Sequence, residues 1–230
     1  MPTHDISDFP RRSHIEIAHE AAIIDYGKPG TWLDSRTRVK ILEEVRSAKD
    51  CPLCLEQRRS LSPYTKEGEH VSQTGLDPIT VEIVHRLCNN ADRLTYRWFE
   101  SILAQGVSAE QYVEIVGLVA TAIIIDGFAG ALGYQTIPAP RAQGGTPTRK
   151  ANDKVVEAGA WIPIMDVENE ETETGLPKIP NIFRAMGLVP ESVRHFFSVM
   201  SSQYSLLPFD TSLDRSQVEY IASKMSSHNQ

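Results

Sequence analysis

The fold is restricted most by a long apolar segment in the middle of the chain, residues 110–132. Ser108 and Gln111 stand three residues apart at its start, which is the spacing of a helix capping box. The pattern predicts a helix that runs to about Gly133. Because apolar side chains lie on nearly all of its sides, this helix must be buried inside a bundle or at a contact between subunits.

Three glycines interrupt this predicted helix: Gly117, Gly127 and Gly130. Glycine inside a helix costs roughly 1 kcal/mol relative to alanine. Close approach of a neighbouring helix is the usual compensation. We therefore expect the helix to form the centre of the core and to take part in an oligomer interface.

Signals for the start of a helix recur in the rest of the chain. Asp34 precedes apolar residues at three- and four-residue spacing, and Asp77 precedes a proline at the first helical position. Ser13 and Glu16 also have the spacing of a capping box. No stretch shows sustained alternation of apolar and polar residues, as a half-buried strand would. The predicted fold class is all-α.

The chain divides into three parts by composition. Residues 1–136 carry the helical signals of a core, and 177–230 are helical again. Residues 137–176, first rich in proline and glycine and then acidic, are predicted to be a linker or an extended arm. Segment 213–230 aligns without gaps with segment 33–50 and stops one residue before the first cysteine would recur. We therefore interpret it as a helical half-repeat that lacks the cysteine pair described below.

Charge and cysteine content exclude several classes of protein. The formal net charge of −7 argues against a nucleic-acid partner. The longest apolar run has eleven residues, 115–125, which is too short to cross a bilayer, and no signal-peptide pattern begins the chain. Three cysteines do not make a secreted disulfide framework. We expect a cytoplasmic protein with no membrane or nucleic-acid partner and no cofactor.

The sequence DCPLC contains the pair Cys51 and Cys54. Pro52 suits the first position of a helix, so Cys51 is expected beside a helix N-terminus, where unpaired N–H groups and the helix dipole favour a thiolate. A thiolate attacks peroxides and disulfides, and Cys54, one turn further, would resolve the intermediate. On this argument Cys51 is the attacking thiol.

Three segments together resemble the carboxymuconolactone decarboxylase and alkylhydroperoxidase superfamily over about residues 30–136. They are LDSRTRVKILEEVRSAKDC, CPLC and the run from LDPITVEIVHRL to GFAGALG. Residues 177–200 resemble the helical lead-in of its peroxidase-related branch. The resemblance implies an all-α, alkylhydroperoxidase-like helical bundle that forms homo-oligomers. It also implies reduction of a hydroperoxide or exchange of a disulfide substrate, with a dithiol electron donor. It makes Cys54 the attacking thiol and Cys51 the resolving one, so the order stays open.

The chain departs from the redox members at two positions. Arg58 stands where they have a histidine, four residues after the second cysteine, and Val39 stands where they have a glutamate. Glu44 and His85 are candidate replacements as proton relays. Arg58 lies on the helical face of Cys54, where a guanidinium would favour a sulfur anion. The candidate catalytic residues are therefore Cys51, Cys54, His85, Glu44 and Arg58.

Other interpretations remain open. Small buried cysteines are common, so the pair could be part of a core without chemistry. His85 and Cys88 share one helical face, so Cys51, Cys54, His85 and Cys88 would make a Cys3His zinc set. The resemblance also permits a carboxymuconolactone decarboxylase-like lyase. A further alternative is a non-catalytic assembly protein that retains the fold.

Overall fold

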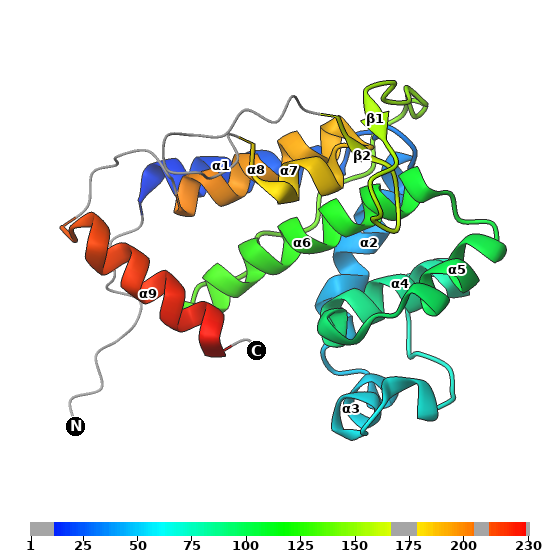
Figure 1. Ribbon diagram of the computed structural model, residues 1–230. Helices are drawn as coiled ribbons and strands as arrows, with labels where there is room; N and C mark the ends of the chain where they lie inside the picture. Colours follow the sequence, from blue (N-terminus) through cyan, green and yellow to red (C-terminus); the bar gives the residue numbers. More distant parts are fainter. Residues whose placement is uncertain (1–11, 167–178, 205–211, 229–230) are drawn as a thin grey trace.

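The computed structural model describes residues 12–166, 179–204 and 212–228 (Figure 1). Over these ranges it contains nine α-helices, which confirms the mostly helical fold. The helices are α1 (Ser13–Tyr26), α2 (Ser35–Ala48), α3 (Pro52–Arg59), α4 (Pro78–Asn89), α5 (Tyr96–Ala104), α6 (Ala109–Ala131), α7 (Asn181–Met186), α8 (Pro190–Gln203) and α9 (Arg215–His228). Two 3-10 turns, η2 (Pro63–Thr65) and η3 (Ala91–Arg93), flank α4, and two-residue strands β1 (Val155–Val156) and β2 (Ile164–Met165) pair antiparallel.

The starts of the helices follow the side-chain signals in most cases. Asp34 and Asp77 each accept a hydrogen bond from the backbone N–H three residues later. Ser108 and Gln111 form the predicted capping box at the start of α6. The prediction for Ser13 is wrong, because α1 begins at Ser13 itself and no side chain caps it. The hydroxyl is one position too far along the chain to act as a cap.

Helix α6 forms the centre of the bundle, as predicted. It packs against α1 and α8 and also against α2 and α4 (Figure 1). Its side chains enter both large apolar clusters, one shared with α1, α2, α4 and α5 and one shared with α7 and α8. Burial of a helix on several sides is what an apolar surface on all sides requires.

The length argument from the eleven-residue run does not hold for the whole helix. Within the described residues, α6 is the one helix long and apolar enough to cross a membrane by these two criteria. More than half of its most apolar stretch is buried among the other helices. The core helix of a soluble protein has the same properties, so this feature is weak evidence for a membrane span.

The glycines of α6 have two different environments. A Cβ atom added at Gly117 would lie 2.9 Å from the Cβ of Ser192 in α8, which shows that the two helices approach closely there. Among the described residues, and apart from the adjacent residues and backbone of α6 itself, no atom lies within 4 Å of a Cβ added at Gly127 or Gly130. Close helix packing therefore explains the first glycine only.

This difference gives opposite expectations for two alanine substitutions. Gly127→Ala should stabilise the protein by about 0.5–1 kcal/mol, because it lowers the entropy of the unfolded chain without a clash. Gly117→Ala should destabilise it, because α8 must move outward. Urea unfolding of the two variants measures both effects. Destabilisation by Gly127→Ala would contradict the open surroundings of this residue and point instead to a contact with a second copy.

The segment that follows α6 lies against the bundle. Gln143 donates its backbone N–H to Gly27, and the backbone N–H groups of Thr148 and Arg149 bond the carbonyls of Gly30 and Thr31. Residues 137–149 are therefore a bound, extended arm along the turn between α1 and α2. Residues 167–176, the acidic part of the predicted linker, lie outside the described residues.

Helix α9 differs from α2 despite the similarity of their sequences. Helix α2 buries seven residues, among them Arg38 and Glu44. Helix α9 lies to one side of the bundle (Figure 1), and its described side chains are exposed or half-exposed. The sequence similarity therefore does not extend to burial.

Candidate dithiol site

The cysteine pair lies at the start of α3, three residues after the end of α2. Cys51 is the N-cap residue of α3 and Pro52 is its first residue, which confirms the predicted helix start. Cys54 follows in the first turn. Both cysteines are free and almost fully buried, with exposed fractions of 2% and 0%. The two sulfur atoms lie within 4.8 Å of one another.

Two imidazole rings face the sulfur atoms. Nδ1 of His85, from α4, lies 3.2 Å from Sγ of Cys54. Nδ1 of His70, from the loop between η2 and α4, lies 3.4 Å from Sγ of Cys54 and 3.5 Å from Sγ of Cys51. The ring centroids are 4.3 Å apart. Each sulfur therefore has an imidazole nitrogen within reach of proton transfer.

A carboxylate orients each imidazole from behind. Oε1 of Glu44 lies 2.8 Å from Nε2 of His85, and Oε2 of Glu82 lies 2.7 Å from Nε2 of His70. A carboxylate only accepts hydrogen bonds, so each Nε2 carries a proton and each Nδ1 is turned toward the sulfurs. The site thus holds two Glu–His pairs that converge on one dithiol.

Further hydrogen bonds fix the two carboxylates. Ser72 and Thr74 donate their hydroxyls to Oε2 of Glu44, at 2.6 and 2.5 Å. Glu82 accepts from Nε of Arg86 at 2.8 Å and from the indole N–H of Trp98 at 3.0 Å. Burial alone would raise the pKa of Glu82, but bonds from His70 and Arg86 outweigh it and lower the pKa to about 2. Both carboxylates are therefore held in place independently of the dithiol.

The surroundings distinguish the two thiols. Burial acts to raise the pKa of Cys51, but hydrogen bonds from the backbone N–H groups of Cys54 and Val71 and from His70 lower it overall. Burial raises the pKa of Cys54, and the neighbouring Cys51 raises it further. Cys51 is thus the group favoured as thiolate, and Cys54 the group favoured as neutral thiol.

The two imidazoles differ in the same way. Burial opposes the positive charge on His70, but its hydrogen bonds to Glu82 and Cys51 prevail and raise its pKa. Burial lowers the pKa of His85, against the effect of Glu44. His70, beside Cys51, therefore holds a proton more readily than a free imidazole does, and Cys51 loses its proton more readily than a free thiol does. A neutral His85 can accept the proton of Cys54.

A cavity of about 440 Å³ reaches Cys51. Its other lining residues are Glu43, Ser47, Asp50, Val71, Gln73 and Thr74. Cys54 does not line it. A small substrate can therefore approach the sulfur of Cys51 from this side, while Cys54 remains behind it.

The structure brings together four of the five predicted catalytic residues: Cys51, Cys54, His85 and Glu44. Arg58 is exposed, and its guanidinium donates to the side-chain oxygen of Asn89 at the end of α4, not to a sulfur. Cys88 of the alternative zinc set is half-buried against the apolar core, where burial raises its pKa to about 12.

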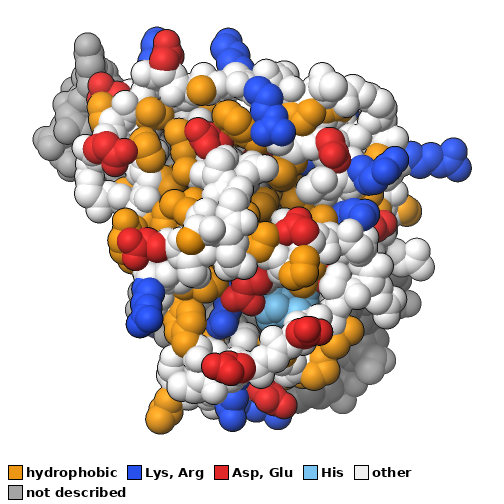
Figure 2. Space-filling view, turned by 90° about the vertical axis from the view of Figure 1, so that its right-hand side faces the viewer, with side chains coloured by type: hydrophobic (Ala, Val, Ile, Leu, Met, Phe, Trp, Pro, Cys, Tyr) orange, Lys and Arg blue, Asp and Glu red, His pale blue; other side chains and the backbone are white. Residues whose placement is uncertain are grey.

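Sequence reasoning missed His70 and Glu82. Glu82 stands three residues before His85 on α4, so the pattern Glu-x-x-His placed it on the same helical face. His70 lies in a loop without regular structure. The sequence of this loop has no periodic pattern that would indicate that it packs against the cysteines. On the face shown in Figure 2, a histidine side chain reaches the surface among acidic side chains.

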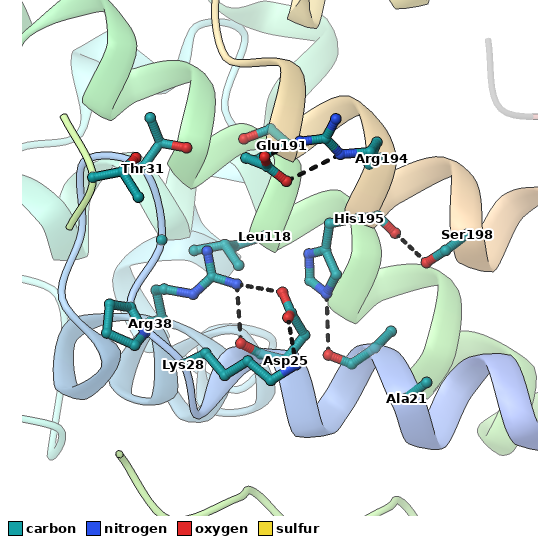
Figure 3. Close-up of a pocket in the computed structure, with 15 residues that line it drawn as sticks. Ala21, Asp25, Lys28, Thr31, Arg38, Leu118, Glu191, Arg194, His195 and Ser198 are labelled. Carbon is teal, nitrogen blue, oxygen red and sulfur yellow. Dashed lines mark hydrogen bonds and ion pairs between the residues drawn. The ribbon is translucent and has the colours of Figure 1, made fainter. Parts of the chain in front are cut away.

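A second cavity, also of about 440 Å³, lies between α1 and α8 (Figure 3). Its charged groups are paired: Arg38 bonds Asp25, Arg194 bonds Glu191, and Nε2 of His195 donates to the carbonyl of Ala22. The Arg38–Asp25 pair joins α2 to α1 and the His195–Ala22 bond joins α8 to α1, whereas Arg194 and Glu191 pair within α8. The cavity is therefore a weaker candidate for chemistry than the dithiol site.

No family model, curated protein or solved structure matches the chain. The relation to the alkylhydroperoxidase-like superfamily therefore stays a prediction from the quoted motifs. Function is accordingly argued below from the site alone.

Proposed function

We propose that the chain is a thiol-dependent oxidoreductase of the alkylhydroperoxidase-like superfamily, which reduces hydroperoxides or exchanges disulfides through Cys51 and Cys54. One observation carries the proposal: a dithiol is enclosed by two oriented Glu–His pairs, and Cys51 lies beside a cavity that Cys54 does not line. Paired bases and an activated thiol are what thiol oxidation requires. The proposal includes a cytoplasmic location, where dithiol donors are available.

In the first step the Cys51 thiolate attacks the oxygen of the hydroperoxide that carries hydrogen. The O–O bond breaks, Cys51 becomes a sulfenic acid, and the leaving alkoxide takes a proton from His70 and departs as an alcohol. With a disulfide substrate, the same thiolate attacks one sulfur and a thiolate leaves. His70 holds its Nδ1 3.5 Å from this sulfur, close enough to serve both cases.

In the second step Cys54 closes onto Cys51. His85 takes the proton of Cys54, the new thiolate attacks the sulfur of the sulfenic acid, and the S–O bond breaks. The departing hydroxide takes the proton back from His85 and leaves as water. The two thiols have then given two electrons to the peroxide, and an external dithiol reduces the resulting disulfide. Glu44 stabilises the imidazolium formed in between.

This order makes Cys51 the attacking thiol, as the helix-start argument predicts and contrary to the resemblance. Its support is threefold: the N-cap position of Cys51, the cavity beside it, and the opposite pKa shifts of the two thiols.

The proposal is tested by three serine variants that are otherwise matched: Cys51→Ser, Cys54→Ser and Cys88→Ser. Each reduced protein is mixed with tert-butyl hydroperoxide, and peroxide loss and protein mass are followed. Wild type and Cys88→Ser should form an internal disulfide, with the loss of two hydrogen atoms. Cys51→Ser should consume peroxide at least about 100-fold more slowly. Cys54→Ser should stop at a sulfenic acid that dimedone traps on Cys51.

Two results would contradict this scheme. If Cys51→Ser retains consumption and forms a trapped sulfenic acid on Cys54, the order given by the resemblance is right and ours is wrong. If neither substitution slows peroxide loss, the redox function itself is wrong.

A further inference from the structure

We propose that the reduced side chains of Cys51, Cys54, His70 and His85 bind one Zn²⁺ ion. Their four donor atoms, two Sγ and two Nδ1, all lie within 4.8 Å of one another. They come from the start of α3, the loop before α4, and α4 itself. This binding is a property of the reduced cluster and does not depend on the proposed function.

The distances suit a tetrahedral ion. Zinc lies about 2.3 Å from thiolate sulfur and about 2.0–2.1 Å from imidazole nitrogen, so tetrahedral ligands place sulfur and nitrogen about 3.6 Å apart. Three of the four sulfur–nitrogen distances in the cluster are 3.5, 3.4 and 3.2 Å, and the fourth, between Cys51 and His85, is within 4.8 Å. For these three pairs, an ion at the centre requires only small outward shifts. Two sulfur and two nitrogen donors in this geometry favour zinc among the divalent metals.

The imidazoles are already oriented as zinc ligands are. A ligating histidine almost always donates its second ring N–H to a carboxylate or carbonyl, which fixes the ring and makes the free nitrogen more basic. Glu44 and Glu82 accept those bonds from His85 and His70 at 2.8 and 2.7 Å. The free Nδ1 atoms converge on the sulfurs rather than on solvent.

The charges around the cluster also suit a cation. Glu44 is fully buried, and its side-chain partners are Ser72, Thr74 and His85. In the part of the chain that the structure describes, no lysine or arginine forms an ion pair with it. Burial acts to raise the pKa of Glu44, but the three hydrogen bonds outweigh it and lower the pKa, so Glu44 is held as an anion behind His85. A Zn²⁺ ion neutralises two thiolates and lies one imidazole away from each carboxylate.

Four protein ligands would close the coordination shell, which is typical of a structural zinc. His70 takes the place of Cys88 in the alternative zinc set considered from the sequence. Bound zinc and a Cys51–Cys54 disulfide exclude each other, since the ion needs both thiolates. If the proposed function holds, two-electron oxidation of the dithiol by a hydroperoxide releases the ion.

The test uses the full-length, reduced protein after removal of metals. Zn²⁺ is titrated in competition with a chromophoric chelator, and X-ray absorption at the zinc edge identifies the donors. We expect one ion per chain with two sulfur and two nitrogen donors. His70→Gln should weaken binding at least 100-fold, whereas Cys88→Ser should leave it unchanged. Circular dichroism verifies that both variants are folded.

Less than one bound ion per chain would overturn the proposal, and so would a shell with three sulfur donors. The absorption result needs no variant, so misfolding of His70→Gln cannot decide the outcome. The two proposals also fail separately. Zinc bound without peroxide-driven disulfide formation rejects only the oxidoreductase. Disulfide formation without zinc binding rejects only the metal site.

Discussion

Replacing Glu44 by glutamine should slow the closure of the Cys51–Cys54 disulfide by about 100-fold while the first attack on peroxide continues. A neutral amide does not stabilise the imidazolium of His85. Its NH2 group can also donate to Nε2 and thereby move the ring proton to Nδ1, which faces Cys54. His85 would then be unable to accept the thiol proton. The sulfenic acid on Cys51 should accumulate and react with dimedone, as it does in Cys54→Ser.

Glu82→Gln is the matched comparison, because Glu82 orients the other imidazole. It should slow the first attack and leave little sulfenic acid, since His70 no longer favours the Cys51 thiolate. Glu56→Gln, on the exposed side of α3, should change neither step. Equal effects of Glu44→Gln and Glu82→Gln on both steps would show that the two Glu–His pairs have no separate roles.

Glu114→Gln should lower the free energy of unfolding by about 3–5 kcal/mol, the usual cost of breaking a buried ion pair from one side. Glu114 is 2% exposed and accepts from the backbone N–H groups of Trp32 and Leu33 at 2.6 and 3.3 Å. It also accepts from Nη1 of Arg38 at 3.0 Å, and the Arg38 side chain is 6% exposed. The substitution removes the buried partner of the Arg38 guanidinium and leaves it with the half-exposed carboxylate of Asp25, at 2.9 Å. At about 2–4 °C per kcal/mol for a chain of this size, thermal unfolding should begin about 10 °C earlier.

Two further variants separate charge from packing. Glu100→Gln, at an exposed position on α5, should alter stability by less than about 0.5 kcal/mol. The double variant Arg38→Met with Glu114→Leu should regain part of the loss, because it removes both buried charges at similar volume. A single Glu114→Gln change that costs under 1 kcal/mol would show that the pair contributes little to stability.

The elements that could be predicted from the sequence depend on contacts a few residues apart. Asp34, Asp77 and Ser108 cap helices through bonds that span three residues, and Pro52 sets the start of α3 in the same local way. The prediction for Ser13 failed because the Ser-x-x-Glu spacing does not show whether Ser13 is the N-cap residue or the first residue of the helix. Local signals thus give the helices and the position of the dithiol.

The missed part of the site depends on contacts between distant segments. The path of a loop brings His70 to the sulfurs, and only α4 packing against that loop brings Glu82 behind it. Arg58 shares a helical face with Cys54. One turn after Cys54, however, this face lies against the end of α4, so Arg58 contacts Asn89 instead of a sulfur. Periodicity gives the face of a helix, and tertiary packing decides what each part of the face contacts.

The loop before α4 is fastened to the helices largely by members of the candidate site. His70 is bonded to Glu82, Ser72 and Thr74 are bonded to Glu44, and Gly75 accepts from Lys40. His70 also lies 3.5 and 3.4 Å from the sulfurs of Cys51 and Cys54, so a change in the bonding at either sulfur would alter how the loop is attached at His70. Oxidation of the buried dithiol would then change how well the loop backbone is protected from hydrogen exchange and proteolysis. This difference would be accessible to a partner protein or a protease at the surface.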